Sequence, residues 1–188
     1  MSVSLWAAMV PEAPQEDTEH GRKASGEGWY VLNARDALWY DRGPRGAVCD
    51  FEAGQDWEQV GVNLFVLGPG QPMSMYHWEA DQEDFLVVHG EALLVIEGEE
   101  RPLRAWDFVH CPPQASHVIV GAGEGPCVVV AVGARQNQTS EGWGAYPVDE
   151  AAARHNAAAE QETNDPKVAY ARFPPREPTR YREGWLPD

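Results

Sequence analysis

Four side chains in two separate stretches have the types and the spacing to bind a metal ion. His77, Glu79 and Glu83 lie close together, and His117 ends the segment 111–117, which has the sequence CPPQASH. Imidazole nitrogen and carboxylate oxygen together suit divalent transition metals. Without a cation, two buried carboxylates would have raised pKa values and would cost stability. We therefore predict a site for iron, manganese, nickel, cobalt or zinc at these four residues.

Two strands must converge for these ligands to meet. On an extended strand His77 and Glu79 point to the same face, because successive side chains alternate. Glu83 keeps this parity only if the chain between them stays regular, and we expect a turn or bulge over residues 80–82 that re-aims its side chain. His117 follows a Pro-Pro turn and begins an apolar run, which indicates a second strand. Two segments converging on one point are typical of a site in the mouth of a β-barrel.

The two stretches resemble the two motifs of the cupin superfamily. The first motif has two histidines one residue apart, then three or four residues, a glutamate, six residues and a glycine. Its slots are filled here by His77, Glu79, Glu83 and Gly90. The second motif is matched by Pro112, Gln114 and His117. The resemblance covers residues 63–132 and implies a small, single-domain cupin.

Several positions depart from the cupin pattern. Glu79 replaces the second histidine, Trp106 and Gln114 occupy two glycine slots, and Gly121 replaces the terminal asparagine.

A second alignment of the first motif is possible. The first motif begins with a glycine, which Gly70 can supply. Counting five residues from Gly70 places Tyr76 and Trp78 in the two histidine slots, which leaves no metal site. The alignment through His77 and Glu79 puts a ligand-type residue in every slot, and we prefer it for this reason.

The strand pattern predicts an all-β fold. Short apolar runs bounded by Gly, Pro or charged residues indicate strands, and many of them at regular spacing favour a sandwich or barrel. They lie at residues 47–51, 60–67, 74–79, 85–88, 92–97, 107–111, 117–120 and 127–132. The cupin resemblance implies the same architecture, a double-stranded β-helix or jelly-roll barrel.

Three segments differ in composition. Residues 1–28 are poor in apolar side chains and are predicted to be a flexible N-terminal arm. Residues 29–133 form the predicted barrel. Residues 134–188 are predicted to contain a short surface helix at 148–161 and an extended tail rich in proline and aromatic residues. These aromatic residues should pack on the barrel or on a second subunit, so we expect a homodimer.

The charge balance limits the partners of the protein. The 188 residues contain 14 Lys and Arg against 30 Asp and Glu, a net charge of −16. Nucleic acid and anionic membranes are therefore poor partners. The apolar runs are too short to span a bilayer, and the three cysteines fit neither a disulfide framework nor a paired zinc motif. We expect a soluble, cytoplasmic protein with reduced thiols.

Two functions are compatible with these residues. Phe85, Val87 and Ile119 share strand parity with the ligands and are the predicted wall of a substrate pocket. The first hypothesis is a metal-dependent enzyme acting on a small organic molecule by dioxygenation or isomerisation. The alternative is a non-catalytic module that binds a small ligand, with or without metal. Because cupins include both, fold alone does not choose between them, and no catalytic residue is assigned.

Overall fold

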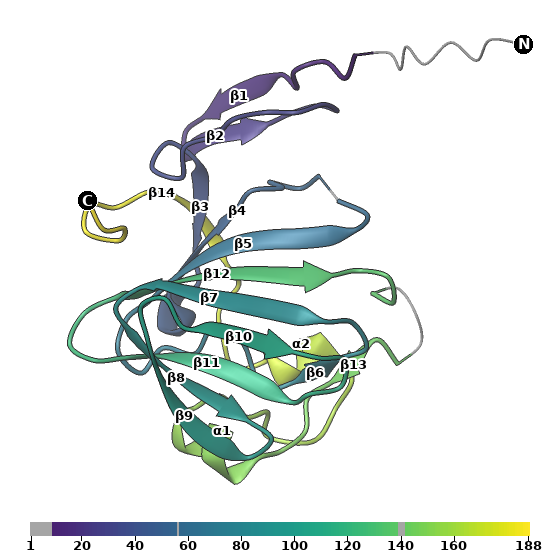
Figure 1. Ribbon diagram of the computed structural model, residues 1–188, viewed down its shortest axis with the longest axis vertical. Helices are drawn as coiled ribbons and strands as arrows, with labels where there is room; N and C mark the ends of the chain where they lie inside the picture. Colours follow the sequence, from purple (N-terminus) through teal and green to yellow (C-terminus); the bar gives the residue numbers. More distant parts are fainter. Residues whose placement is uncertain (1–8, 56, 139–141) are drawn as a thin grey trace, which may run out of the picture.

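The protein folds as an antiparallel β-barrel, shown by a computed structural model that describes residues 9–55, 57–138 and 142–188 (Figure 1). One wall is a seven-stranded sheet. Its order is β10 (Phe108–Cys111), β7 (Glu83–His89), β12 (Cys127–Ala134), β5 (Val60–Leu67), β4 (Ala47–Asp50), β3 (Leu38–Asp41) and β14 (Glu177–Arg180). The opposite wall contains β11 (His117–Ala122), β8 (Glu91–Ile96) and β9 (Glu99–Arg104), in that order. A pair of two-residue strands, β13 (Gly144–Ala145) and β6 (Trp78–Glu79), lies beside β11.

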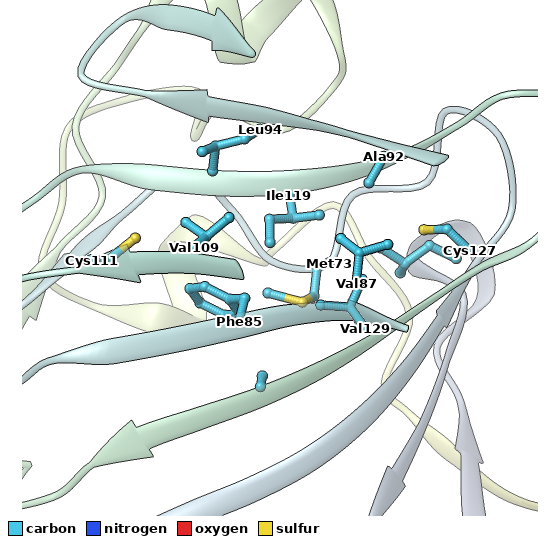
Figure 2. Packing of buried hydrophobic residues seen from close by; sticks show 12 residues of the cluster. Met73, Phe85, Val87, Ala92, Leu94, Val109, Cys111, Ile119, Cys127 and Val129 are labelled. Atoms are coloured by element: carbon cyan, nitrogen blue, oxygen red, sulfur yellow. The ribbon is translucent and has the colours of Figure 1, made fainter. Parts of the chain in front are cut away.

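The core lies between the two walls. Ile119 and Leu94 from β11 and β8 face Phe85 and Val109 from β7 and β10, as Figure 2 shows. All four side chains are buried, and Ile119 is fully inaccessible to solvent. Burial of apolar side chains on alternate positions of each strand is the main contribution to the stability of such a barrel. The predicted all-β jelly-roll fold is confirmed.

Most predicted strands are present, and several observed strands were not predicted. The predicted strand 60–67 coincides with β5, whereas the predicted strand 74–79 is reduced to β6. The sequence prediction omitted β3, and it did not place β9 as a separate strand. β9 has the sequence EERPLR, and among the described strands it pairs only with β8, at the edge of its sheet. Charged residues and a proline are tolerated on an edge strand, which explains why a search for apolar runs does not find it.

The expectation of a flexible N-terminal arm is corrected for residues 9–28. Strands β1 (Gln15–Thr18) and β2 (Gly21–Ala24) form a hairpin that projects from the barrel (Figure 1). Oppositely charged residues face each other across it, and Arg22 Nε lies 2.8 Å from Asp17 Oδ1. Cross-strand charge pairs stabilise a hairpin that has little apolar surface, which composition alone does not reveal. The rest of the predicted arm, residues 1–8, lies outside the described residues.

The predicted surface helix is much shorter than expected and is not peripheral. Helix α1 (Glu150–Arg154) begins at Asp149, whose side chain accepts a hydrogen bond from Ala152 N, and ends before Asn156, which has a φ of 56°. The following alanines are buried against the outer face of β8 and β11. Small side chains let the backbone approach closely, and Ala157 O accepts a hydrogen bond of 2.6 Å from the backbone N of Tyr76.

The aromatic tail packs against its own barrel. Helix α2 (Pro166–Ala169) is followed by an extended path that ends in β14, which pairs with β3. Trp185 packs against the fully buried Trp39, with ring centroids 5.1 Å apart. This agrees with the expected contact between tail and barrel. The homodimer stays a prediction.

The three cysteines are buried free thiols, as predicted. Burial raises the pKa of Cys49 to about 12 and that of Cys127 to about 11, so both thiols stay protonated and unreactive at neutral pH. No helix within the described residues is long and apolar enough to cross a membrane.

Candidate metal centre

Two histidines enter the site from facing strands. His77 precedes β6 and His117 begins β11, and the two residues form an antiparallel bridge. His77 is 7% exposed and His117 only 1%, so both imidazoles are held inside the barrel. Phe85 packs against the His117 ring with a centroid distance of 5.2 Å, and Tyr146 stacks on the His77 ring at 5.8 Å. The rings are therefore fixed by packing before any ligand binds.

At both histidines, a hydrogen bond to the backbone carbonyl two residues earlier fixes which imidazole nitrogen faces the site. His77 Nδ1 lies 2.8 Å from Met75 O, and His117 Nδ1 lies 2.9 Å from Ala115 O. A carbonyl oxygen can only accept, so each Nδ1 must carry the proton and donate it. In the neutral imidazole, Nε2 then has a free lone pair directed into the barrel. Orientation of a ligating histidine by a backbone carbonyl is a common feature of protein metal sites.

Glu83 supplies the carboxylate between the two imidazoles. It begins β7 after a bend over residues 80–82, as predicted, and the Asp81 carboxylate at this bend accepts hydrogen bonds from Asn137. Glu83 Oε2 lies 3.4 Å from His77 Nε2 and 3.3 Å from His117 Nε2. One oxygen and two nitrogens thus surround one position.

This arrangement fits a divalent metal. Donor atoms of His77, Glu83 and His117 all lie within 4.8 Å of one another. Two donors bound at about 2.0–2.2 Å to the same ion are separated by about 3–3.5 Å, close to the observed distances. Glu83 Oε2 and His117 Nε2 are buried, and neither makes a hydrogen bond with any described residue. Buried polar atoms without a hydrogen bond are rare, and a bound ion is one of the partners that account for them.

Glu79 has a more peripheral position than we predicted. Its Oε1 lies 3.6 Å from His77 Nε2, but Glu79 is not part of the group formed by His77, Glu83 and His117. Its backbone O accepts a hydrogen bond from Gln114 N, and its side chain is 26% exposed, against 16% for Glu83. Three of the four predicted ligands therefore converge, and Glu79 lies at their edge.

The site is electrostatically adapted to positive charge. Burial alone would lower the pKa of His77, but the carboxylates of Glu79 and Glu83 outweigh it and raise this pKa to about 10. Burial alone would also lower the pKa of His117, but Cys111 and Glu83 raise this pKa to about 9. Burial would raise the pKa of Glu83, yet the two imidazoles hold it far below its usual range. In the metal-free protein, protons thus occupy the place of a cation.

The predicted pocket residues lie deeper than the cavity at the ligands. Phe85, Val87 and Ile119 belong to the buried core cluster between the walls. A cavity of about 130 Å³ opens beside the carboxylates instead, and its lining residues are Gly61, Glu79, Glu83, Gly133, Ala134, Arg135 and Gln138. Sequence reasoning missed the glycines of this lining. Gly61 and Gly133 face each other across β5 and β12, a register that only strand pairing reveals.

A family model described as a cupin domain matches residues 63–133. Residues 63–133 are a cupin domain. The resemblance that we inferred from the two motifs is thereby confirmed, and the matched segment contains all four predicted metal ligands.

Solved structures similar to this cupin cover about half of the chain. A sugar phosphate isomerase from Silicibacter pomeroyi is 26% identical over 55% of this chain and 62% of its own, with a TM-score of 0.43. This chain therefore spans less than two thirds of that protein's length. A predicted oxalate decarboxylase from Thermotoga maritima is 16% identical over 56% of this chain and 99% of its own, with a TM-score of 0.50, and shows the shared fold.

A further similar structure is a cupin family protein with a double-stranded β-helix fold from Methanocaldococcus jannaschii. It is 20% identical over 44% of this chain and 76% of its own, with a TM-score of 0.41. The comparison with curated proteins gives no match.

Two departures from the cupin motifs retain the backbone conformation of glycine. Trp106 and Gln114, in glycine slots, have φ angles of 77° and 72°, in the left-handed region that favours glycine. Trp106 is 75% exposed and does not face the cupin site. Two further histidines near the motifs also lie outside the site, because His89 is exposed at the end of β7 and His110 is exposed beside Asp84.

Proposed function

We propose that this cupin domain binds a divalent transition metal through His77, Glu83 and His117 and is an enzyme that acts on a small, polar organic molecule. The supporting observation is that Glu83 Oε2 and His117 Nε2 are buried without a hydrogen bond among the described residues, in a site where both Nδ1 atoms are committed to backbone carbonyls. A bound cation would take the place of the protons that hold the metal-free site and would give both atoms a ligand bond.

The set of donors favours oxygen-dependent chemistry. Two histidines and one carboxylate with open positions are the ligand set of non-haem iron(II) oxygenases. A bound metal would supply Lewis acidity or, for iron, a redox centre. The protein residues would then act around it: His77 and His117 as neutral ligands, Glu83 as the anionic ligand, and Glu79 as a polar group at the cavity.

The cavity limits the size and the polarity of the substrate. Its volume of about 130 Å³ is well below the 300–1,000 Å³ typical of small-molecule pockets. Its lining includes the polar residues Glu79, Arg135 and Gln138 together with the two glycines. A molecule of a few carbon atoms with polar groups fits such a space better than a sugar phosphate.

The test begins with metal content. Protein purified without chelator is analysed for bound metals, reloaded with iron(II), manganese, nickel, cobalt or zinc, and assayed for oxygen uptake with a panel of small hydroxy and keto acids. We expect about one metal per chain and oxygen uptake with at least one substrate. Protein that stays metal-free in every case would contradict the proposal and favour the alignment with Tyr76 and Trp78 in the ligand slots.

Other outcomes identify the alternatives. Isomerisation of a substrate without oxygen uptake would keep the metal site and change the reaction class. Stoichiometric metal with saturable ligand binding but no turnover would indicate the non-catalytic binding module instead of the enzyme.

A further inference from the structure

The chain immediately before His77 leaves the sheet. Pro72 bridges Val120 and His77 bridges His117, so the four residues 73–76 lie opposite only the two residues 118 and 119. A bulge of this kind removes backbone groups from the ladder of hydrogen bonds. Every buried N–H in the bulge therefore needs another partner.

Met75 lies at the centre of this bulge and is fully buried. Its backbone N donates a hydrogen bond of 3.1 Å to the hydroxyl of Tyr170, and its carbonyl accepts the hydrogen bond of 2.8 Å from His77 Nδ1. The same residue thus contacts Tyr170 on one side and the imidazole of His77 on the other. A residue distant in sequence is connected to the His77 ring through one backbone unit.

Tyr170 is itself held firmly by its surroundings. Its ring lies under the guanidinium of Arg45, 4.6 Å from Cζ to the centroid, and meets the Tyr146 ring edge-on at 5.7 Å. It follows α2, where Asp165 accepts a hydrogen bond from Lys167 N. Tyr146 in turn stacks on the ring of His77. The C-terminal segment therefore reaches His77 by two routes, one through Met75 and one through Tyr146.

We propose that Tyr170 is a positioning residue for the metal site: its hydroxyl fixes the Met75 backbone, which holds Nδ1 of His77 and so directs Nε2 at Glu83. This inference rests on the proposed metal site. It assigns a role to the C-terminal segment, which lies outside the matched cupin domain and contributes no ligand of its own.

Removal of the hydroxyl would loosen this connection without removing the ring. In a Tyr170→Phe variant, the packing under Arg45 and against Tyr146 is retained, but the buried Met75 N–H loses its acceptor. An unpaired buried N–H drives the backbone to move toward another partner. The Met75 carbonyl would move with it, and the His77 ring would lose its fixed orientation. Loss of such an outer partner of a ligand typically weakens metal binding 10- to 100-fold.

The chain offers a matched control. The hydroxyl of Tyr76 also accepts a hydrogen bond from a backbone N, that of Gly98, at 3.1 Å. Tyr76 is buried as well, 3% exposed, but it belongs to the cluster on the outer face of β8 and β11. Tyr76→Phe removes the same type of hydrogen bond next to the site in sequence, without touching the link to His77 Nδ1.

The experiment measures metal affinity by chelator competition, with nickel(II) as the probe, in the full-length wild type and both variants. We expect Tyr170→Phe to bind about 10-fold more weakly and Tyr76→Phe to stay within about twofold of the wild type. Thermal unfolding of both variants reports the purely structural effect, which should be similar in the two. Equal nickel affinity of Tyr170→Phe and Tyr76→Phe would overturn the inference.

A second measurement needs no metal. The Nδ1–H of His77 in the metal-free protein should give a slowly exchanging NMR signal, identified by its absence in His77→Gln, and this signal should exchange faster only in Tyr170→Phe. Unchanged exchange in Tyr170→Phe would also overturn the inference. A wild type that binds no nickel would contradict the proposed function, and the proton signal would still decide the role of Tyr170.

Discussion

His77 and His117 exchange both of their backbone hydrogen bonds. His77 N lies 3.1 Å from His117 O, His117 N lies 2.8 Å from His77 O, and the ring centroids are 5.0 Å apart. Directly opposite residues of antiparallel strands have side chains on the same face. This single pairing therefore brings the two motifs together, and a slip of one residue would point one imidazole out of the barrel.

His77, Glu83 and His117 should each contribute more to metal binding than Glu79 does. His117→Ala should abolish stoichiometric metal binding, because it removes the only ligand from β11. Glu79→Ala should weaken binding by a smaller factor, since Glu79 lies outside the group of three. Elemental analysis at neutral pH measures both, with circular dichroism as a check of folding.

A control for these variants is His110→Ala. His110 is exposed and bonds only to Asp84 among the described residues, so its loss should leave the metal content unchanged. If Glu79→Ala loses as much metal as His117→Ala, Glu79 is a full ligand and the three-residue assignment is wrong.

The metal-free protein should become less stable as the pH rises. The neighbouring carboxylates raise the pKa of His77 to about 10, despite its burial, above the value of about 6.5 expected in the unfolded chain. A raised pKa in the folded state contributes stability that is complete below about pH 6.5 and is lost as the pH rises through about 10. Urea unfolding at several pH values across this window measures the loss.

Metal-loaded protein provides the comparison for the pH series. Its ligand imidazoles are already neutral, so the decline above pH 7 should be much smaller, and metal affinity should increase with pH as protons stop competing. Parallel pH dependence of the two forms would show that His77 is not the group responsible.

A side chain at Gly133 should close the cavity. A Cβ at this position would lie 3.8 Å from Cγ and Oε1 of Glu83, an ordinary contact, so a larger residue fits the strand but fills the space beside the ligand. Gly133→Val should keep its metal and weaken the binding of azide to the cobalt-loaded protein, measured by absorption. Gly125→Val is the control, because a Cβ at Gly125 meets nothing within 4 Å. Equal azide affinity in both variants would show that small ligands do not reach the metal through this cavity.

The C-terminal tail should stabilise the barrel through Trp185. Trp185→Ala removes the contact with the buried Trp39 and should lower the free energy of unfolding by about 1 kcal/mol or more. Trp106→Ala, at a side chain that is 75% exposed, should change it by less than about 0.5 kcal/mol. Denaturant midpoints measure both. A Trp185→Ala variant as stable as Trp106→Ala would show that the tail contributes little.

Local sequence determined the fold class and the candidate ligands. The spacing of His77, Glu79 and Glu83 and the position of His117 behind Pro112 and Pro113 resemble both cupin motifs, and the shared face of His77 and Glu79 follows from strand parity. The strand 60–67 and the bend at 80–82 follow from apolar runs and their interruption in the same way. The N-cap of α1 at Asp149 is also a local feature.

Tertiary structure decided which of these residues meet and what supports them. The hairpin β1–β2 depends on cross-strand charge pairs, and the burial of the alanines after α1 depends on a sheet surface formed by distant strands. The peripheral place of Glu79 and the cavity between Gly61 and Gly133 depend on strand register. The contact of Tyr170 with Met75 joins residues 95 positions apart. Sequence patterns report local conformation and the face of each strand, whereas these contacts arise only when separate segments compete for the same buried surface and hydrogen-bond partners.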